Sequence, residues 1–327
     1  MKVKKDDRIL LTGGTGFLGS YILEELLHKG FTNIHVLSRN KIDSSLYQLR
    51  YLQGDVLDVF RLDDLIQNID CVIHAAAIVS FEKKDRREMF AVNVEGTANL
   101  VNVSLDHGVR RFIHVSSTAA IGKNLDDSEI TENTKWSDKL THTQYALSKF
   151  LSEKHVWRAH AEGLQVSVVN PALILGKGDW KSGTSGFFSK IDKGLKYYPI
   201  GSNGIVAASD VARFVTELLF QEDFGERYIL SSENMTYKTL FQQIASQLSV
   251  KAPYIPIEGK YRLLALLKER VSRVTGSKTN YLTKESLKNI SEKKRYSNSK
   301  SLSKFDFQYQ SIPSLLNQIS AEYLQNS

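Results

Sequence analysis

One stretch decides the fold of this chain: Leu10-Leu11-Thr12-Gly13-Gly14-Thr15-Gly16-Phe17-Leu18-Gly19. The apolar residues at its start are typical of a buried parallel strand, and those after it recur at helical spacing up to Leu27. Gly13 allows a tight turn, Gly16 lets a ligand approach the backbone, and Gly19 lets helix and strand pack closely. The helix N-terminus supplies free N–H groups, so the stretch predicts a dinucleotide site.

The composition limits the class of protein. The chain has 327 residues, of which 42% are hydrophobic and 24% charged, as is typical of a globular protein with a sizeable core. No apolar run reaches the ~20 residues of a membrane span, and no signal peptide is recognised at the start. The single Cys71 excludes an internal disulfide and a cysteine-based metal site. We therefore expect a cytoplasmic protein with no bound metal and no membrane contact.

Charge is distributed unevenly along the chain. The net charge is +7, and basic residues greatly outnumber acidic ones between Lys260 and Lys304. A basic region can attract nucleic acid or an acidic substrate. These lysines recur at helical spacing and no aromatic ladder interleaves with them, which is typical of solvated helix faces. We therefore expect no nucleic-acid partner.

Strand-like and helix-like segments alternate through the first half of the chain. Strands are expected at 33–38, 51–53, 70–74, 111–116 and 166–170, and helices at 61–67, 86–107 and 144–161. This alternation predicts an α/β fold with a doubly wound parallel sheet, the Rossmann type, whose ligands lie at the C-terminal ends of the strands.

The second half is expected to complete this sheet and to add a smaller, mainly helical, substrate-binding subdomain. A helix is expected at 210–220, a strand at 227–230, and helices at 238–248, 261–274, 283–291 and 312–324. The predicted division gives 1–171 and 205–230 to the dinucleotide-binding domain, and 172–204 and 231–327 to the substrate subdomain. The Gly- and Ser-rich loop 176–186 is typical of either a mobile cover or a plain surface connection.

The end of the second strand predicts which dinucleotide binds. In such sites an acidic residue bonds the free 2′-hydroxyl of NAD, whereas an arginine pairs with the 2′-phosphate of NADP. Arg39 stands there with Lys41 close by, so NADP(H) is preferred and NAD(H) remains possible; the alternative is an ordinary surface arginine. Asp55, just past the third strand, can accept a hydrogen bond from adenine or can cap the next helix.

A tyrosine and a lysine form the predicted chemical centre. Tyr145 and Lys149 stand four residues apart on a predicted helix and therefore project from one face. An ammonium ~4 Å away, at an effective dielectric constant of ~20, would favour the phenolate by about 4 kcal/mol and lower the tyrosine pKa by about 3. Tyr145 can then donate a proton to a carbonyl oxygen or remove one from an alcohol. Ser117, at the end of the fifth strand, would hydrogen-bond the same oxygen.

Each of these residues alone is more typical of a solvated surface pair or a turn serine. Together they resemble the extended short-chain dehydrogenase/reductase superfamily, in its NAD-dependent epimerase/dehydratase group. The resemblance covers about the first 230 residues. It is carried by Thr12–Gly19, Gly54-Asp55, His74-Ala75-Ala76-Ala77, Asn93-Val94-Glu95-Gly96-Thr97, Val115-Ser116-Ser117 and Tyr145-Ala146-Leu147-Ser148-Lys149.

The resemblance implies a fold, a site and a partner. It implies a sheet of about seven strands and a homodimer through a four-helix bundle made from the helices around 86–107 and 144–161. It makes Ser117, Tyr145 and Lys149 the catalytic triad. The residues expected at the cofactor are Gly13, Thr15, Gly16, Phe17, Leu18, Gly19, Arg39, Asp55, Val56, Ala75, Ala76, Ala77, Asn93, Ser116, Tyr145, Lys149 and Pro171.

Other stretches look most like the dihydroflavonol-4-reductase-like branch, whose members reduce a ketone, aldehyde or acyl-CoA with NADPH. They are Val36-Leu37-Ser38-Arg39, Tyr198–Val206 and Asp210-Val211-Ala212. The chain departs from the pattern at Ala207-Ala208-Ser209, where relatives carry an acidic residue or histidine. It also has Thr143-Gln144-Tyr145 where cinnamoyl-CoA reductases have Asn-Trp-Tyr. No individual substrate is therefore predicted.

Three functions are compatible with these residues. The favoured one is an NADP(H)-dependent oxidoreductase that interconverts a small ketone or aldehyde and its alcohol. A nucleotide-sugar epimerase or dehydratase would instead keep NAD bound through purification and act without added cofactor. A non-catalytic dinucleotide sensor typically lacks the active-site tyrosine, so Tyr145 and Lys149 count against that reading.

Overall fold

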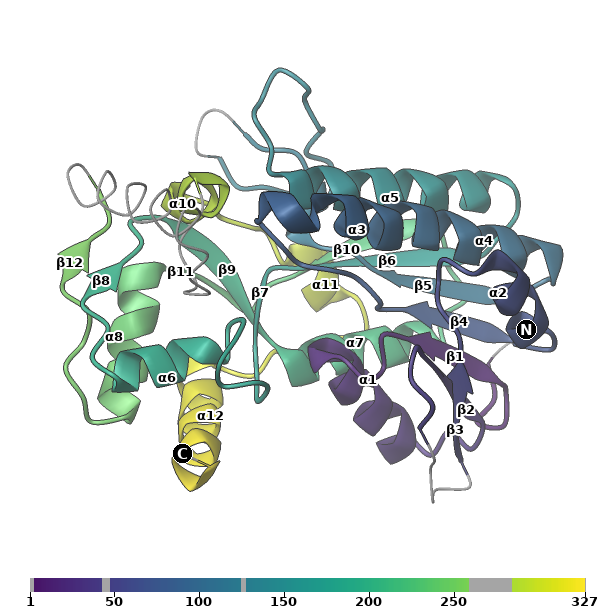
Figure 1. Ribbon diagram of the computed structural model, residues 1–327, viewed down its shortest axis with the longest axis horizontal. Helices are drawn as coiled ribbons and strands as arrows, with labels where there is room; N and C mark the ends of the chain where they lie inside the picture. The colour runs from purple at the N-terminus through teal and green to yellow at the C-terminus, as the bar shows by residue number, and fades with distance from the viewer. Residues whose placement is uncertain (1–2, 43–47, 125–127, 259–283, 327) are drawn as a thin grey trace.

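The computed structural model describes residues 3–42, 48–124, 128–258 and 284–326. A seven-stranded parallel sheet crosses the larger part of the molecule, in the order β10-β6-β5-β4-β1-β2-β3 (Figure 1). Its strands are β1 (Ile9–Thr12), β2 (Ile34–Ser38), β3 (Leu49–Gln53), β4 (Cys71–His74), β5 (Arg111–Val115), β6 (Val166–Pro171) and β10 (Glu226–Leu230). The strand order reverses between β1 and β4, the place where doubly wound sheets bind ligands. The predicted fold class is confirmed.

Helices cover both faces of this sheet. On one face lie α1 (Phe17–His28) and α7 (Ala208–Leu218). On the other lie α2 (Val59–Ile66), α3 (Arg86–Phe90), α4 (Gly96–Asp106) and α5 (Gln144–Ala161). Side chains alternate between the two resulting cores, with Leu11 and Cys71 in one and Leu10 and Val72 in the other. Burial on both faces explains why the strands are almost uniformly apolar.

The helix expected at 86–107 is present, but it is not a single regular α-helix. A π-helical turn, Ala91–Glu95, separates α3 from α4 without breaking the run. Such turns add one residue to a helix and occur mostly at functional sites. Here the turn carries Asn93, whose side chain is engaged in the protein interior.

The remaining elements form a second layer beside the C-terminal ends of the main strands (Figure 1). Two small sheets are present, β11-β9-β7 and β12-β8. Their strands are β7 (Leu173–Leu175), β8 (Tyr197–Tyr198), β9 (Ser202–Ala207), β11 (Glu233–Thr236) and β12 (Ile255–Pro256). The helices are α6 (Gly186–Asp192), α8 (Tyr237–Gln247), α10 (Lys284–Ser291) and α12 (Ile312–Asn326). The short helix α11 (Ser299–Ser303) packs instead against β10, the edge strand of the main sheet.

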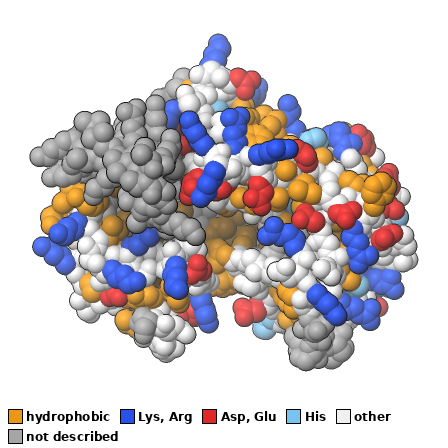
Figure 2. Space-filling model, in the orientation of Figure 1, with side chains coloured by type: hydrophobic (Ala, Val, Ile, Leu, Met, Phe, Trp, Pro, Cys, Tyr) orange, Lys and Arg blue, Asp and Glu red, His pale blue; other side chains and the backbone are white. Residues whose placement is uncertain are grey.

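The second part is mainly helical, as expected, and the small sheets are an addition that the sequence did not predict. The strands are short and pair with segments far away in the chain, so local periodicity does not reveal them. The helix predicted at 261–274 lies outside the described residues. Apolar side chains are visible in the hollow between the two parts of the molecule (Figure 2). Within the described ranges, no helix is both long and apolar enough to span a membrane.

Candidate active site

The glycine turn, residues 13–19, joins β1 to α1. Gly13 has a φ of +73°, and a Cβ on it would lie 2.6 Å from the main-chain nitrogen of Ala76. A Cβ on Gly19 would lie 1.9 Å from the carbonyl oxygen of Gly13. Both distances are far below a van der Waals contact, so the tight turn and the close helix packing expected at these positions are present.

Gly16 and the start of α1 offer a place for a phosphate. Gly16 is the N-cap residue, no side chain caps the helix, and its first turn holds no acidic residue. A Cβ on Gly16 would meet the carbonyl oxygen of Gly13 at 3.2 Å and no other described atom within 4 Å. Thr15 and Gly16 are exposed, whereas Phe17 and Leu18 are half-buried. Uncapped N–H groups beside open space fit the pyrophosphate of a dinucleotide.

The alanines that follow β4 lie against this turn. Ala75 N–H donates to the Thr12 carbonyl at 3.1 Å, and Ala76 N–H donates to the Thr12 hydroxyl at 3.2 Å. The Thr12 hydroxyl also bonds His74 Nδ1 at 2.7 Å. Ala77 is exposed. The small residues that follow β4 are therefore held next to the glycine turn.

The expected adenosine side lies at the ends of β2 and β3. Arg39 is exposed directly after β2. Asp55 Oδ1 accepts from Leu57 N–H at 3.0 Å, whereas α2 is capped by Asp58, whose side chain accepts from Arg61 N–H. The alternative in which Asp55 caps that helix is therefore wrong. Val56 beside it is buried.

Asn93 lies behind the loop that follows β4. Its side chain accepts from Ile78 N–H at 2.8 Å and donates to the Ile78 carbonyl at 2.9 Å and to Ser148 Oγ at 3.0 Å. The side chain is 1% exposed. It therefore links this loop to α5, and its amide is engaged within the protein.

The structure brings Ser117, Tyr145 and Lys149 together. Ser117 follows β5, and its side chain lies beside that of Tyr145, near the start of α5, close enough to act on the tyrosine pKa. Lys149, one turn further along α5, is 1% exposed and donates from Nζ to the Val115 carbonyl at 2.9 Å. Pro171 ends β6, the strand next to β5. All of these residues lie at the C-terminal edge of the sheet, where the glycine turn also lies.

Local sequence explains the helix that presents the tyrosine. Thr143 is the N-cap of α5, and its hydroxyl accepts from Ala146 N–H at 3.0 Å. The departure from Asn-Trp-Tyr therefore still supplies a cap. The Phe81 ring packs edge-on against the Tyr145 ring, with centroids 6.1 Å apart. Sequence reasoning missed this contact because Phe81 lies in a loop without a recognisable pattern.

The electrostatics of the site differ from the sequence-based expectation. Burial lowers the pKa of Lys149 to about 8, and the nearby Glu153 carboxylate opposes that change. Burial raises the pKa of Tyr145 above its usual value of 10.0, and the Ser117 side chain opposes that rise. Lys149 therefore does not lower the tyrosine pKa by about 3, because its ammonium group is directed to the Val115 carbonyl. Tyr145 is a neutral phenol at neutral pH.

Ser116 and the loop 176–186 complete the surroundings. The Ser116 hydroxyl is buried, without a hydrogen-bond partner among the described residues. In the loop, Ser185 Oγ donates to the Gly176 carbonyl at 3.0 Å. The Tyr21 hydroxyl of α1 accepts from Lys177 N–H at 2.6 Å. The loop is thus anchored to the helix that begins at the glycine turn, which favours an ordered connection.

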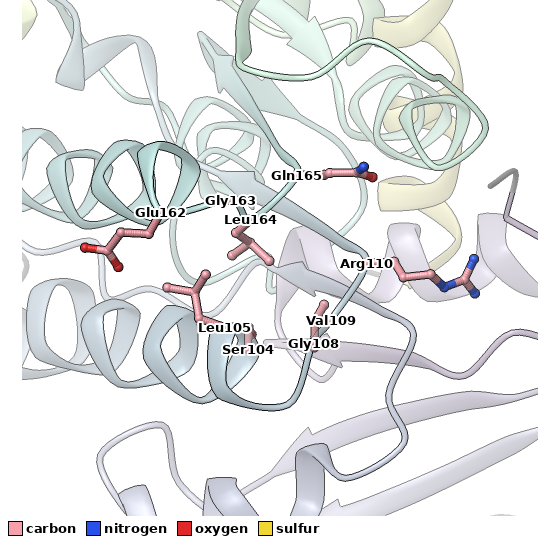
Figure 3. Close-up of a pocket in the computed structure, with 9 residues that line it drawn as sticks. All are labelled: Ser104, Leu105, Gly108, Val109, Arg110, Glu162, Gly163, Leu164 and Gln165. Carbon is pink, nitrogen blue, oxygen red and sulfur yellow. The ribbon is translucent and has the colours of Figure 1, made fainter.

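A cavity of about 350 Å³ lies at the opposite edge of the sheet, where α4 and α5 end (Figure 3). It is lined by Ser104, Leu105, Gly108, Val109, Arg110, Glu162, Gly163, Leu164 and Gln165. It contains none of the predicted site residues. Within the described part of the chain, no group of three or more His, Cys, Asp and Glu side chains is placed to hold a metal ion.

Several known proteins are similar to this chain. Residues 9–227 match the model of the NAD dependent epimerase/dehydratase family. Sterol demethylase protein B of Methylococcus capsulatus is 30% identical over 274 residues, covering 81% of this chain and 82% of that protein. Cinnamoyl-CoA reductase 1 of Petunia hybrida is 32% identical over 185 residues, covering 51% of this chain and 54% of that protein. The crystal structure of gox2253 superposes with a TM-score of 0.83 at 27% identity, covering 98% of this chain and 99% of that chain.

Proposed function

The chain belongs to the NAD-dependent epimerase/dehydratase family of extended short-chain dehydrogenases/reductases, and from this membership we propose an NADP(H)-dependent reductase of small ketones or aldehydes. The family and its relatives are NAD(P)-dependent oxidoreductases, epimerases and dehydratases, so the chain is an enzyme of this kind. The substrate class, the catalytic roles and the choice of NADP are our proposal. Two features support a reductase. Several stretches resemble the dihydroflavonol-4-reductase-like branch, and reductases are among the relatives.

One observation carries the proposal: the Ser117 side chain lies close enough to Tyr145 to act on its pKa, and Lys149 lies one helical turn further along α5. A carbonyl oxygen that takes up a proton needs a donor within hydrogen-bond reach. The neutral Tyr145 phenol is such a donor, and the Ser117 hydroxyl can hold the same oxygen. In the reverse direction the same group must first lose its proton before it can take one from the alcohol.

The chain's own residues divide the work of this reaction. When bound, the nicotinamide supplies a hydride to the carbonyl carbon. Tyr145 donates the proton to the carbonyl oxygen, and Ser117 orients that oxygen and stabilises the charge that develops on it. Lys149, a buried ammonium group one helical turn beyond Tyr145, would contact the nicotinamide ribose. Gly16 and the uncapped start of α1 would hold the pyrophosphate.

Arg39 supports the choice of NADP. It stands exposed at the end of β2, where the 2′-position of the adenosine ribose is expected, and the residues beside it, Ser38 and Asn40, are not acidic. Fluorescence titration with NADPH and with NADH tests this choice, followed by a screen of ketones and aldehydes for NADPH oxidation. We expect tighter binding of NADPH and turnover of at least one carbonyl compound. Tight NAD retained through purification, with turnover of nucleotide sugars in the absence of added cofactor, would contradict the proposal.

We further propose that the enzyme is a homodimer joined through α4 and α5. These two helices lie side by side on one face of the sheet (Figure 1). On α5, Leu147 and Leu151 keep part of their surface exposed, although both are large apolar side chains. A second copy packing its own α4 and α5 against this pair would cover that surface.

A further inference from the structure

Glu153 is a buried carboxylate one helical turn beyond Lys149 in α5. About 1% of its surface is exposed. A buried charge is costly unless its oxygens are paired. One oxygen accepts from the Asn170 side chain at 2.6 Å, and the other accepts from Arg227 at 2.7 Å and from Trp157 at 3.4 Å. Glu153 is therefore ion-paired with the partly exposed Arg227 of β10 and hydrogen-bonded to Asn170 of β6, both on the sheet that α5 covers.

Asn170 extends this pairing to the candidate catalytic serine. Its Nδ2 group donates to Glu153 and also to the main-chain carbonyl oxygen of Ser117, at 2.9 Å. Asn170 has no exposed surface and lies in β6, beside the end of β5 from which the Ser117 turn begins. Both hydrogens of the amide are thus in use. The turn that carries the serine hydroxyl is held by the same side chain that binds the carboxylate.

Glu153 is also the negative charge that acts on Lys149. The Lys149 ammonium is buried and hydrogen-bonded to a main-chain carbonyl, and burial lowers its pKa while Glu153 opposes that change. His74 of β4 and His114 of β5 are the other titratable side chains packed around this group. Burial lowers the pKa of both, so they are neutral at neutral pH. Arg227 faces Glu153 from the other side, in β10.

Building on the function proposed above, we propose that Glu153 and Asn170 are positioning residues of the active site. Glu153 places a fixed negative charge one helical turn from the Lys149 ammonium, and Asn170 fixes the main chain that carries Ser117. Both are buried, so they act through those two residues. Together they keep the lysine charged and the serine in place over the working pH range.

The pH dependence of activity tests the role of Glu153. If activity needs the Lys149 ammonium, it is lost as pH rises through the lysine pKa. In Glu153→Gln the carboxylate no longer favours the ammonium, so the alkaline limb of kcat for NADPH oxidation should move to lower pH by about one pH unit. A purely structural role would lower kcat at every pH and leave the limb where it is, and that result would overturn the proposal.

Matched variants separate charge from packing. Glu153→Gln leaves Arg227 without its partner, so the double variant with Arg227→Gln removes both charges and should tolerate burial better. It should show the same shift of the alkaline limb. Glu153→Asp keeps the charge and should restore the wild-type limb, although at lower kcat. Trp157→Phe removes the 3.4 Å hydrogen bond but keeps an aromatic ring beside the Arg227 guanidinium, and it should leave the profile unchanged.

Asn170→Ala tests the second half of the proposal. Loss of the hydrogen bond to Ser117 should displace the serine hydroxyl, and a displacement of about 1 Å can cost ~100-fold in rate. We expect kcat to fall by ~10- to 100-fold while NADPH affinity stays within about twofold of wild type. Equal losses in kcat and in NADPH affinity, or no loss, would contradict a positioning role.

A titration that needs no turnover distinguishes failure of this inference from failure of the proposed function. NMR of protein labelled at lysine Cε follows the Lys149 signal, assigned by its absence in Lys149→Gln. The midpoint of that signal should move to lower pH in Glu153→Gln, whether or not any carbonyl substrate is turned over. An unchanged midpoint refutes the role of Glu153, whereas a moved midpoint without reductase activity refutes the proposed function alone.

Discussion

Replacing Gly16 by alanine should weaken dinucleotide binding without unfolding the protein. A Cβ at this position would meet the carbonyl oxygen of Gly13 at 3.2 Å and otherwise point into open space among the described atoms. Gly16 has a φ of −89°, which alanine adopts freely. As an N-cap change it should cost less than about 1 kcal/mol. The Tm should therefore fall by no more than about 3 °C.

The same methyl group would occupy the space that the pyrophosphate needs. Overfilling a close contact costs about 1–3 kcal/mol. NADPH should therefore bind about 10- to 100-fold more weakly. Gly19→Ala is the matched control, because its Cβ would lie 1.9 Å from the Gly13 carbonyl oxygen and α1 would have to move by roughly 1 Å or more. That variant should lose Tm as well as affinity, by about 2–4 °C for each kcal/mol.

Thermal unfolding and NADPH fluorescence titration measure both effects in one set of samples. The expected result is separation: Gly16→Ala keeps its Tm and loses affinity, whereas Gly19→Ala loses both. Wild-type affinity for NADPH in Gly16→Ala would refute the placement of the pyrophosphate at this turn. A large fall in Tm for Gly16→Ala would refute the conclusion that the space beside Gly16 is open.

Three further predictions concern the cofactor, the lysine and the assembly. Arg39→Ala should weaken NADPH binding about 10-fold or more and leave NADH binding unchanged, since only the former carries a 2′-phosphate; equal losses would contradict it. Because the buried Lys149 has a pKa of about 8, activity should be constant below about pH 7 and decline as pH rises through 8, measured as kcat against pH; activity that keeps rising to pH 10 would argue against a catalytic ammonium. Leu151→Arg should convert a dimer into a monomer in light scattering after gel filtration, because a buried arginine at the proposed α4 and α5 interface lacks a partner.

Much of the main sheet could be predicted from the sequence because its strands are short apolar runs between clear turn signals. The helix expected at 144–161 matches α5 at both ends, because Thr143 supplies a recognisable cap and the periodicity continues to Ala161. The small sheets could not be predicted in this way. Two-residue strands such as β8 pair only with distant segments, and their register depends on the finished fold.

The residues of the proposed triad were identifiable because three separate motifs converge on one edge of a parallel sheet. The pKa shifts of Tyr145 and Lys149 could not be predicted, since the direction of the Lys149 side chain depends on the Val115 carbonyl. Glu153 could have been noticed as an acidic residue four positions after the lysine. The partners of Glu153 could not have been noticed in this way. Asn170 and Arg227 are far from it in sequence, and they reach it from β6 and β10 only in the folded chain.

The most direct test of the central claim is NADPH oxidation by Tyr145→Phe, with NADPH binding measured on the same sample. The variant removes one hydroxyl and keeps the ring that packs against Phe81. Turnover of the carbonyl compound found in the screen should fall by at least ~100-fold, while NADPH binds as in the wild type. Wild-type turnover in Tyr145→Phe would contradict the account, because the proton would then come from another group.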